Sequence, residues 1–202
     1  MTEPAELRLF VAFTLPEPVK DQLSQAQAEL RRVFPEGVVR WAPRKQFHLT
    51  LKFLGNVDAA NLDPLIEALR IAACPFGPLR LRAEQLGFFP QARWPRVIWA
   101  GVRDAQQQLG LLQAAVQRAT DAFTSEQPEG AFIGHVTLAR VQQPGRIDSL
   151  RLVDVANNFS NRCFGEWTAN ELGLLRSELS PTGARHTTVA FTPLGGSTES
   201  LS

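Results

Sequence analysis

The sequence predicts an α+β fold with two pseudo-symmetric lobes of antiparallel sheet plus helices around a central cleft. Short segments with strand-like alternation are interspersed with two long segments that have the apolar spacing of helices. A His-x-Thr-Leu unit occurs twice, at His48–Leu51 and at His135–Leu138, each time in a strand-like segment. Each half of the chain therefore has one such strand and at least one long helix, which favours two similar lobes that face each other.

Strand-like and helix-like segments alternate from the first residues onward. Residues 8–15 form an apolar, β-branched and aromatic run that stops at Pro16, which indicates a buried strand. Apolar residues recur at helical spacing over 18–34, and the sequence Pro-Glu-Gly ends that helix. The other elements expected here are strands over 38–41 and 47–54, the second ending at Gly55–Asn56, and a short helix over 62–73.

The remainder of the chain repeats this alternation. Strands are expected over 79–89 and 96–102, and the proline-containing stretch between them is typical of a hairpin or a longer loop. A second long helix is expected over 104–123, where leucines and valines fall on one face. The last elements expected are a strand over 134–141, a helix over 147–158, and two terminal strands over 168–179 and 185–194 that meet at a turn.

Length and composition fit one globular domain. The 202 residues are 44% hydrophobic and 20% charged, which allows a sizeable core. We expect a single bilobal domain over residues 1–195 and a solvated tail over 196–202. The net charge of +1 argues against a protein that coats nucleic acid through bulk electrostatics. Recognition of a single phosphate or of a strand end remains open.

Cysteine and histidine usage indicates neither a disulfide framework nor a metal centre. Cys74 and Cys163 are far apart and form no paired motif, and three separated histidines without adjacent acids make a poor ligand set. Glycine patterns that bind nucleotide cofactors are absent, so no cofactor is expected. Because no basic leader or run of about 18 apolar residues is present, we expect a cytoplasmic protein without a membrane partner.

The spacing of the two His-x-Thr units indicates acid–base chemistry. Residues i and i+2 of a strand point to one face, so His48 projects with Thr50 and His135 projects with Thr137. Two such units across a cleft suit in-line displacement at phosphorus. One histidine acts as base, the other acts as acid, and the threonines stabilise charge on the non-bridging oxygens. For either unit taken alone, the alternative is that its histidine is a structural residue of a strand. Threonine is common in strands as well, so the threonine does not argue against this alternative.

The sequence resembles the two-histidine phosphoesterases. More narrowly, it is similar to the bacterial and archaeal RNA 2',3'-cyclic phosphodiesterases, also called 2'-5' RNA ligases. The resemblance spans nearly the whole chain and rests, in order, on "RLFVAFTLP", "VRWAPRKQFHLTLKFLGNV", "LGFFPQARWPRVIWAGV", "GHVTLAR" and "LLRSELSPTGARHTTVAFTPL". It implies a bilobal fold with one motif from each lobe, and metal-independent hydrolysis of a cyclic phosphate at an RNA end.

The resemblance also implies a role for each motif residue. His48, in the first motif, corresponds to the proton donor, and His135, in the second, corresponds to the proton acceptor. Thr50 and Thr137 correspond to phosphate ligands. Arg140 follows the second motif, as an arginine often does in the family, which implies that it binds substrate.

Strand alternation complicates the placement of two cations. It puts Arg140 on the face opposite His135, so Arg140 reaches the cleft only if the strand ends or bulges at Ala139. Otherwise Arg140 is a surface ion-pair residue. The same alternation puts Lys52 on the face of His48, although a lysine at a strand end commonly faces solvent.

The third histidine and three aromatic residues are further candidates for the cleft. His186 opens "HTTV" where the family has a tyrosine, and this chain contains no tyrosine. We expect His186 in an aromatic or polar wall position without a catalytic role. Trp41, Phe47 and Phe89 are candidates to stack on a base, with a place in the core as the alternative for each.

Together with the resemblance, these observations predict hydrolysis of an RNA terminal 2',3'-cyclic phosphate to a 2'-phosphomonoester, with RNA ends as partners. The oligomeric state stays open, with a monomer favoured. Two alternatives stay open. The first is the reverse reaction, 2'-5' ligation of RNA such as tRNA halves, since one site can catalyse both directions. The second is a non-catalytic protein that binds RNA ends, which a turnover assay on a cyclic nucleotide would distinguish.

Overall fold

The structure is a computed structural model that describes residues 6–92, 94–126, 130–144, 149–180 and 183–195. The expected tail over 196–202 and the centre of the expected turn at 181–182 lie outside the described residues, as do residues 147–148 of an expected helix. Among the described residues, no helix is long and apolar enough to cross a membrane.

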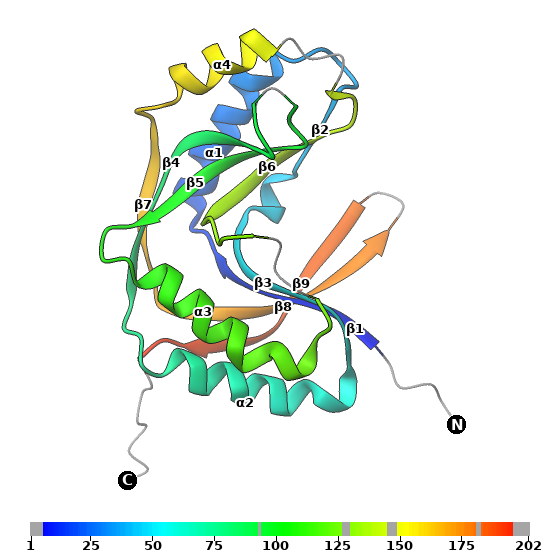
Figure 1. Cartoon of the computed structure of the whole chain (residues 1–202), viewed down its shortest axis with the longest axis vertical. Helices are drawn as coiled ribbons and strands as arrows, with labels where there is room; N and C mark the ends of the chain where they lie inside the picture. Colours follow the sequence, from blue (N-terminus) through cyan, green and yellow to red (C-terminus); the bar gives the residue numbers. More distant parts are fainter. Residues whose placement is uncertain (1–5, 93, 127–129, 145–148, 181–182, 196–202) are drawn as a thin grey trace.

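The strands form one curled antiparallel sheet in the order β7-β4-β5-β6-β3-β1-β8-β9, and β2 also pairs with β6 (Figure 1). Their bounds are β1 (Glu6–Thr14), β2 (Val39–Trp41), β3 (His48–Asp58), β4 (Leu79–Phe89), β5 (Val97–Asp104), β6 (His135–Val141), β7 (Cys163–Ala169), β8 (Glu171–Ser180) and β9 (Gly183–Pro193).

The sheet divides into two lobes between its two motif strands. β3 and β6 are joined through one ladder pair, Leu49 with Val136. On one side, β6 pairs with β5 and with β2, and the sheet continues through β4 to β7. We call these five strands the β6 lobe. On the other side β3 continues into β1, β8 and β9, which we call the β3 lobe. Each lobe therefore contributes one His-x-Thr strand to the junction, as the sequence predicts.

The helices cover both lobes, but two of them pack against the lobe other than the one whose strand precedes them in the chain. They are α1 (Glu17–Arg31), α2 (Leu62–Ala73), α3 (Gln108–Thr120) and α4 (Ser149–Asn158). α1 follows β1 of the β3 lobe yet packs against β7, whereas α3 follows β5 of the β6 lobe yet packs against β3 and α2 (Figure 1). The predicted α+β class with two lobes is confirmed, and the lobes exchange helices instead of being consecutive halves of the chain.

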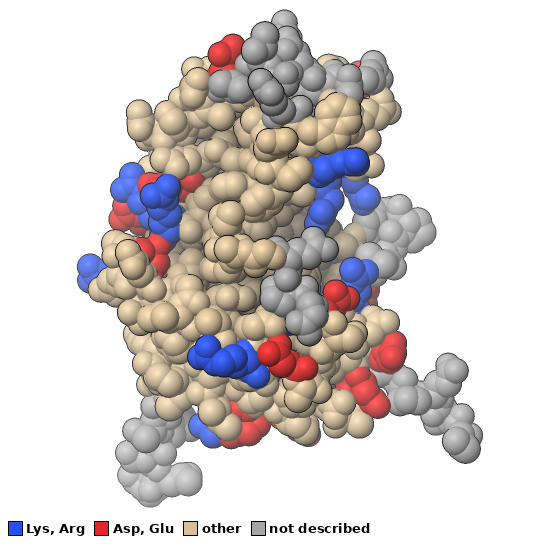
Figure 2. Space-filling model, in the orientation of Figure 1, with Lys and Arg blue, Asp and Glu red and all other residues tan. Residues whose placement is uncertain are grey.

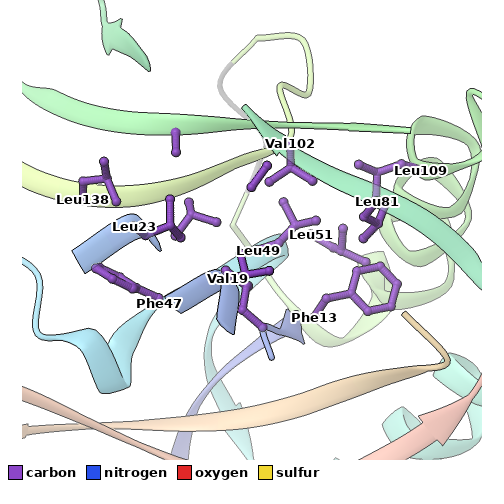
Figure 3. Close-up of a cluster of buried hydrophobic side chains, with 14 of the residues drawn as sticks. Phe13, Val19, Leu23, Phe47, Leu49, Leu51, Leu81, Val102, Leu109 and Leu138 are labelled. Atoms are coloured by element: carbon purple, nitrogen blue, oxygen red, sulfur yellow. The ribbon is translucent and has the colours of Figure 1, made fainter. Parts of the chain in front are cut away.

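One hydrophobic core runs through both lobes. Leu49 and Val136 lie between the histidine and the threonine of their motifs, and Leu51 and Leu138 follow the threonines. Each of these four side chains is at most 4% exposed. They pack with apolar side chains of α1, α3 and the neighbouring strands (Figure 3). We call this side of the sheet the core face and the opposite side the open face. Burial of the alternate residues anchors the motif strands, which leaves the histidines and threonines on the open face.

Several element boundaries differ from the prediction by one to four residues, among them the end of α1, the end of β3 and the start of α3. α1 ends at Arg31, three residues early. β3 does not end at Gly55 but continues to Asp58, because Gly55 adopts φ +65° at an irregularity and pairing with β1 resumes beyond it. α3 begins four residues after Asp104, because the Asp104 carboxylate accepts hydrogen bonds from the backbone N–H groups that precede and begin the helix.

The pattern does not predict strand β7. Gly165 lies in its middle with φ +129°, and a glycine inside a strand obscures the alternation that identifies one. A Cβ on Gly165 would lie 3.0 Å from a methyl carbon of Val19 in α1. The glycine thus permits α1 to pack closely on the edge of the sheet.

Candidate active site

A bulge follows the threonine of the first motif. In the pairing of β3 with β1, Thr50 lies opposite Ala12, and Lys52 lies opposite Val11, the next residue back. Leu51 is therefore an extra residue. Both Leu51 and Lys52 are buried, at 4% and 5% exposure. Such a bulge puts two consecutive side chains on one face and reverses the alternation beyond it.

The second motif has the same bulge at the equivalent position. In the pairing of β6 with β5, Thr137 lies opposite Trp99, and Ala139 lies opposite Ile98. Leu138 is the extra residue, and it is fully buried together with Ala139. The two motif strands thus share their irregularity as well as their His-x-Thr-Leu sequence.

The bulge in β6 places the side chain of Arg140 on the open face. Strand alternation predicted that Arg140 would reach the cleft only if the strand ended or bulged at Ala139. Arg140 is exposed while Val141 after it is buried, as expected for alternation that restarts after the bulge. Its charge acts on His135, because the guanidinium is one of the causes that lower the pKa of that imidazole. The structure therefore brings Arg140 to the face of His135 and Thr137.

The bulge in β3 has the opposite effect on Lys52. The prediction that Lys52 shares the face of His48 is wrong, because the extra residue sends its side chain to the core face. Its ammonium donates to the carbonyl of Glu126 at 2.9 Å and lies 3.8 Å from a carboxylate oxygen of Asp121. Lys52 is accordingly part of the packing beside α3 and not of the candidate site.

Two glutamines from the covering helices hold the carbonyls of the bulged residues. Gln27 of α1, only 6% exposed, donates to the carbonyls of Leu138 at 2.7 Å and Ala42 at 2.9 Å. Gln113 of α3 donates to the carbonyl of Leu51 at 3.3 Å. Sequence reasoning missed both. For Gln27 the available signal was an amide within an otherwise apolar helix face.

The motif residues are arranged crosswise at the junction of the lobes. Around the antiparallel pair of Leu49 with Val136, the two strands run in opposite directions. His48 consequently lies on the side of Thr137, and Thr50 lies on the side of His135. All four side chains are half-buried, and neither threonine hydroxyl donates to or accepts from a described residue. Two imidazoles and two free hydroxyls therefore gather on one face.

Backbone contact orients the imidazole of His135. Its Nδ1 lies 2.7 Å from the carbonyl oxygen of Ile133, which can only accept, so Nδ1 carries the hydrogen. The other ring nitrogen, Nε2, then has a free lone pair. Burial is the main cause that lowers the pKa of His135, the charge of Arg140 adds to it, and the bond to Ile133 opposes it. Burial and the charge of Arg140 together outweigh the bond to Ile133 and favour the neutral imidazole.

The imidazole of His48 is the more deeply buried of the two. Burial, followed by the positive charge of His186, lowers the pKa of His48 to about 4, and His135 contributes in the same direction. A hydrogen bond to the backbone of Gln46 opposes the shift. Both motif histidines thus bond to the backbone two residues earlier, at Gln46 and Ile133. Both are neutral at pH 7 in the ligand-free protein.

Aromatic rings line both histidines. In the β3 lobe, Phe10 lies 4.9 Å from His48 between ring centroids. In the β6 lobe, Phe89 lies 5.0 Å and Trp99 lies 5.9 Å from His135. Phe89 was a sequence candidate, while Phe10 and Trp99 were missed, although strand alternation alone puts Phe10 on the face away from the core. The rings cover part of each imidazole and contribute to its burial.

His186 lies in an aromatic wall, the position expected for it. It belongs to β9, opposite Ser177 of β8, and its ring centroid is 4.9 Å from Phe10 and 5.2 Å from His48. Burial lowers the pKa of His186. Its Nδ1 is buried without a hydrogen-bond partner among the described residues. The contact with His48 was not predicted.

The other two aromatic candidates lie elsewhere. Phe47 is 2% exposed and belongs to the core. Trp41 packs against Phe34 with centroids 5.9 Å apart, and the guanidinium of Arg31 lies 5.2 Å from its ring. Since α1 and the chain after it supply these contacts, Trp41 lies on the core face. Of the three candidates, the structure places only Phe89 beside a motif histidine.

The chain is similar to proteins of one phosphoesterase family. Residues 13–99 match the family model described as LigT like Phosphoesterase. The RNA 2',3'-cyclic phosphodiesterase of Thermus thermophilus is 34% identical over 197 residues, which cover 94% of this chain and 91% of the relative. The protein of the same name from Methanothermobacter thermautotrophicus is 29% identical over 185 residues, covering 90% of this chain and 96% of the relative.

Solved structures show the same fold. A crystal structure of a protein from Thermus thermophilus matches with a TM-score of 0.76 at 30% identity, covering 95% of this chain and all of that one. The apo crystal structure of E. coli LigT matches with a TM-score of 0.70 at 22% identity, covering 95% of this chain and 99% of that one. Both structures match nearly the whole chain, with its two lobes.

Proposed function

Because the chain belongs to the LigT-like phosphoesterase family, we propose that it hydrolyses the 2',3'-cyclic phosphate at the end of an RNA to a 2'-phosphomonoester, without a metal ion. The general reaction is that of its relatives, which are named RNA 2',3'-cyclic phosphodiesterase. The observation that carries the proposal is the crosswise arrangement of two His-Thr pairs around Leu49 and Val136.

His135 acts as the general base. Its Nδ1 is occupied by the carbonyl of Ile133, so Nε2 accepts a proton from the attacking water. As that proton leaves, the water oxygen forms a bond to phosphorus. The lowered pKa of His135 keeps the imidazole neutral, and therefore basic, over most of the physiological range.

His48 acts as the general acid. It donates its proton to O3' as the bond between phosphorus and O3' breaks, which leaves the phosphate on O2'. In the ligand-free protein the pKa of His48 is lowered to about 4, mainly by burial. A phosphate anion between the two imidazoles favours the protonated form of the ring next to it, so binding of the substrate raises the protonated fraction of His48.

Thr50, Thr137 and Arg140 stabilise charge on the non-bridging oxygens. Both hydroxyls lack partners among the described residues and share the open face with the histidines. Arg140 returns to that face after the bulge and supplies a positive charge. Two hydroxyl donors and one guanidinium provide the charge stabilisation that a metal ion would otherwise supply.

A turnover assay with product identification tests the proposal. Purified protein in EDTA is incubated with an oligonucleotide that ends in a 2',3'-cyclic phosphate, and phosphorus NMR identifies the product. We expect only the 2'-phosphate, because a fixed acid faces one of the two ester oxygens. His135→Asn is the matched control, since its amide can still donate to Ile133 while Nε2 is lost.

Other outcomes of this assay would contradict part of the proposal or support one of the two alternative functions. A 3'-phosphate or a mixture contradicts the assignment of the acid to O3', and activity that returns only with a divalent ion contradicts metal independence. A 2'-5' linked product formed with a 5'-hydroxyl oligonucleotide indicates the reverse reaction at the same site. Tight binding without turnover indicates a protein that binds RNA ends.

A further inference from the structure

Two arginines stand side by side next to the candidate site. In the pairing of β2 with β6, Arg40 lies directly opposite Arg140. Directly opposite residues of an antiparallel pair share a face, with Cα atoms about 5 Å apart. The next pair, Trp41 with Ala139, packs on the core face. Arg40 and Arg140 therefore both project from the open face.

Nothing in the described part of the chain neutralises this pair. Both side chains are exposed, and neither guanidinium forms an ion pair or hydrogen bond with a described residue, whereas nearby Arg44 binds Glu17 and Asp21. Figure 2 shows Lys and Arg side chains gathered near the position of β2. Like charges directly opposite on a sheet destabilise each other. Such a pair is best explained by an anionic ligand.

The β3 lobe has an aromatic ring where the β6 lobe has this charge. Phe53 is the second residue after the extra residue Leu51 in β3, as Arg140 is the second after Leu138 in β6. It is 56% exposed and lies 5.9 Å from Phe10 between ring centroids. The two lobes, similar in their motifs, thus differ in charge beyond them. An anionic chain that leaves the site is attracted over the β6 lobe.

We propose that Arg40 binds the phosphate group on the 5'-oxygen of the terminal nucleoside, next to the cyclic phosphate that Arg140 contacts. The proposal rests on the proposed function, which puts the cyclic phosphate beside His135 and Arg140. Arg40 lies one strand farther away, so it meets a second phosphate. A cyclic end has no phosphate beyond it, and the next phosphate must be on the 5' side. A guanidinium binds such a group with two parallel hydrogen bonds.

This assignment makes Arg40 a residue that selects substrates. It favours a nucleotide that carries a 5'-phosphate group over a simple nucleoside 2',3'-cyclic phosphate. The group has two sources, the internucleotide diester of an RNA and the terminal 5'-phosphate of a mononucleotide. The exposure of Arg40 favours the RNA diester, because a chain that continues beyond this phosphate then runs into solvent and not into the protein.

Three substrates separate these sources. They are adenosine 2',3'-cyclic phosphate, its 5'-phosphorylated form, and the dinucleotide ApA with a 2',3'-cyclic end. We expect wild-type kcat/KM for the dinucleotide to exceed that for the first substrate by about 10–100-fold. Arg40→Gln should lower this ratio about 10-fold. Arg118→Gln removes the same charge from an exposed position of α3 and should leave the ratio as it is.

The salt dependence provides a second measure. Each phosphate contact to single-stranded nucleic acid contributes about −0.7 to the slope of log affinity against log salt. Arg40→Gln should reduce that slope for the dinucleotide and not for the cyclic nucleoside. A preference that Arg40→Gln leaves intact, or a wild-type protein without preference, would overturn the proposal. A preference for the 5'-phosphorylated mononucleotide alone would overturn the choice of the RNA diester.

A binding experiment keeps this test separate from the proposed function. Affinities of 2'-AMP and of ApA with a terminal 2'-phosphate are measured by titration calorimetry on the same three proteins. A tighter wild-type affinity for the dinucleotide that is lost in Arg40→Gln supports the phosphate site even if no substrate turns over. Equal wild-type affinities contradict the site even if turnover is rapid.

Discussion

The imidazole of His186 meets that of His48 edge to face, with ring centroids 5.2 Å apart. Both rings also contact Phe10, each at 4.9 Å. The positive charge of His186 is, after burial, the second cause of the lowered pKa of His48. A histidine outside the two motifs therefore belongs to the immediate surroundings of the proposed acid.

The three histidines should respond differently to substitution. His48→Ala and His135→Asn should each lower kcat by about 10²–10⁴-fold, the loss expected for one proton-transfer group. His186→Phe keeps a ring against Phe10 and should lower kcat by less than about 10-fold. Steady-state kinetics on a cyclic nucleotide, with circular dichroism to establish folding, measures these effects. A folded His186→Phe protein as inactive as His48→Ala would refute the two-histidine assignment.

The pH dependence of kcat/KM should be bell-shaped with a maximum below pH 6.5. The pKa of His48 is lowered to about 4, so the protonated acid is lost as the pH rises above that value. The pKa of His135 is lowered from 6.5, so the neutral base is lost only as the pH falls below that lowered pKa. Rate profiles from about pH 4 to 9 at constant ionic strength report these free-enzyme values.

Two further features sharpen the pH test. The whole kcat profile should lie at higher pH than the kcat/KM profile, because the bound phosphate anion raises the pKa of both imidazoles. In His186→Phe the pKa of His48 should rise, because one positive charge beside it is gone, and NMR titration of the imidazole measures that rise. The groups that face His48 are His186 and His135. A kcat/KM plateau that extends above pH 8 would contradict an acid with a lowered pKa.

Stability should fall on acidification through the same histidine. The pKa of His48 is 6.5 in the unfolded chain and about 4 in the folded protein, so the unfolded state binds the proton first. The contribution is complete above pH 6.5 and is lost as the pH falls toward 4, with a magnitude of roughly 2–3 kcal/mol. Urea unfolding at several pH values measures it. In His48→Phe the free energy of unfolding should depend less on pH over this interval.

Alternation along strands predicted the motif face from sequence because it depends only on neighbouring residues. It placed His48 with Thr50 and His135 with Thr137 correctly, and the leucines behind them are in the core. It failed for Lys52, one residue beyond a bulge. The extra residue is defined by the register with β1, a partner that the pattern of β3 alone does not specify.

Contacts between segments that are distant in the sequence could not be predicted from the pattern either. Gln27 is 111 residues from Leu138, and only the packing of α1 under the other lobe brings them together. Phe10 and His186 approach His48 from β1 and β9, which are not its neighbours along the chain. The crossing of helices between lobes brings Gln27 to Leu138, and the strand order of the sheet brings Phe10 and His186 to His48. Neither has a signature in the periodicity of a single segment.

The threonines should act as donors to the transition state. Thr50→Val and Thr137→Val keep the β-branched shape and remove only the hydroxyl, so the strands should be retained. Each should lower kcat by about 10–10³-fold, the range for loss of one such donor. The measurement is kcat in EDTA, which should leave wild-type activity unchanged. An unchanged kcat in both variants would show that the hydroxyls do not contact the reacting phosphate.

Gln27 should position the second motif without touching substrate. Its amide is the side-chain donor to the carbonyls of Leu138 and Ala42, and Leu138 is the bulged residue that turns Arg140 to the open face. In Gln27→Leu two buried carbonyls lose a donor, which should lower the free energy of unfolding by about 1–3 kcal/mol. The bulge then loses a support, and we expect kcat/KM to fall about 10-fold.

A double-mutant cycle distinguishes positioning from general destabilisation. If Gln27 acts through Arg140, then Gln27→Leu should have little further effect on kcat/KM in a protein that already carries Arg140→Gln. Gln113→Leu is the matched control, because Gln113 supports the equivalent carbonyl of Leu51 in the other lobe. Its effect should add to that of Arg140→Gln, since the bulge in β3 does not set the direction of Arg140. Additive effects for Gln27→Leu, or a loss of stability with unchanged kcat/KM, would show that its hydrogen bonds are structural only.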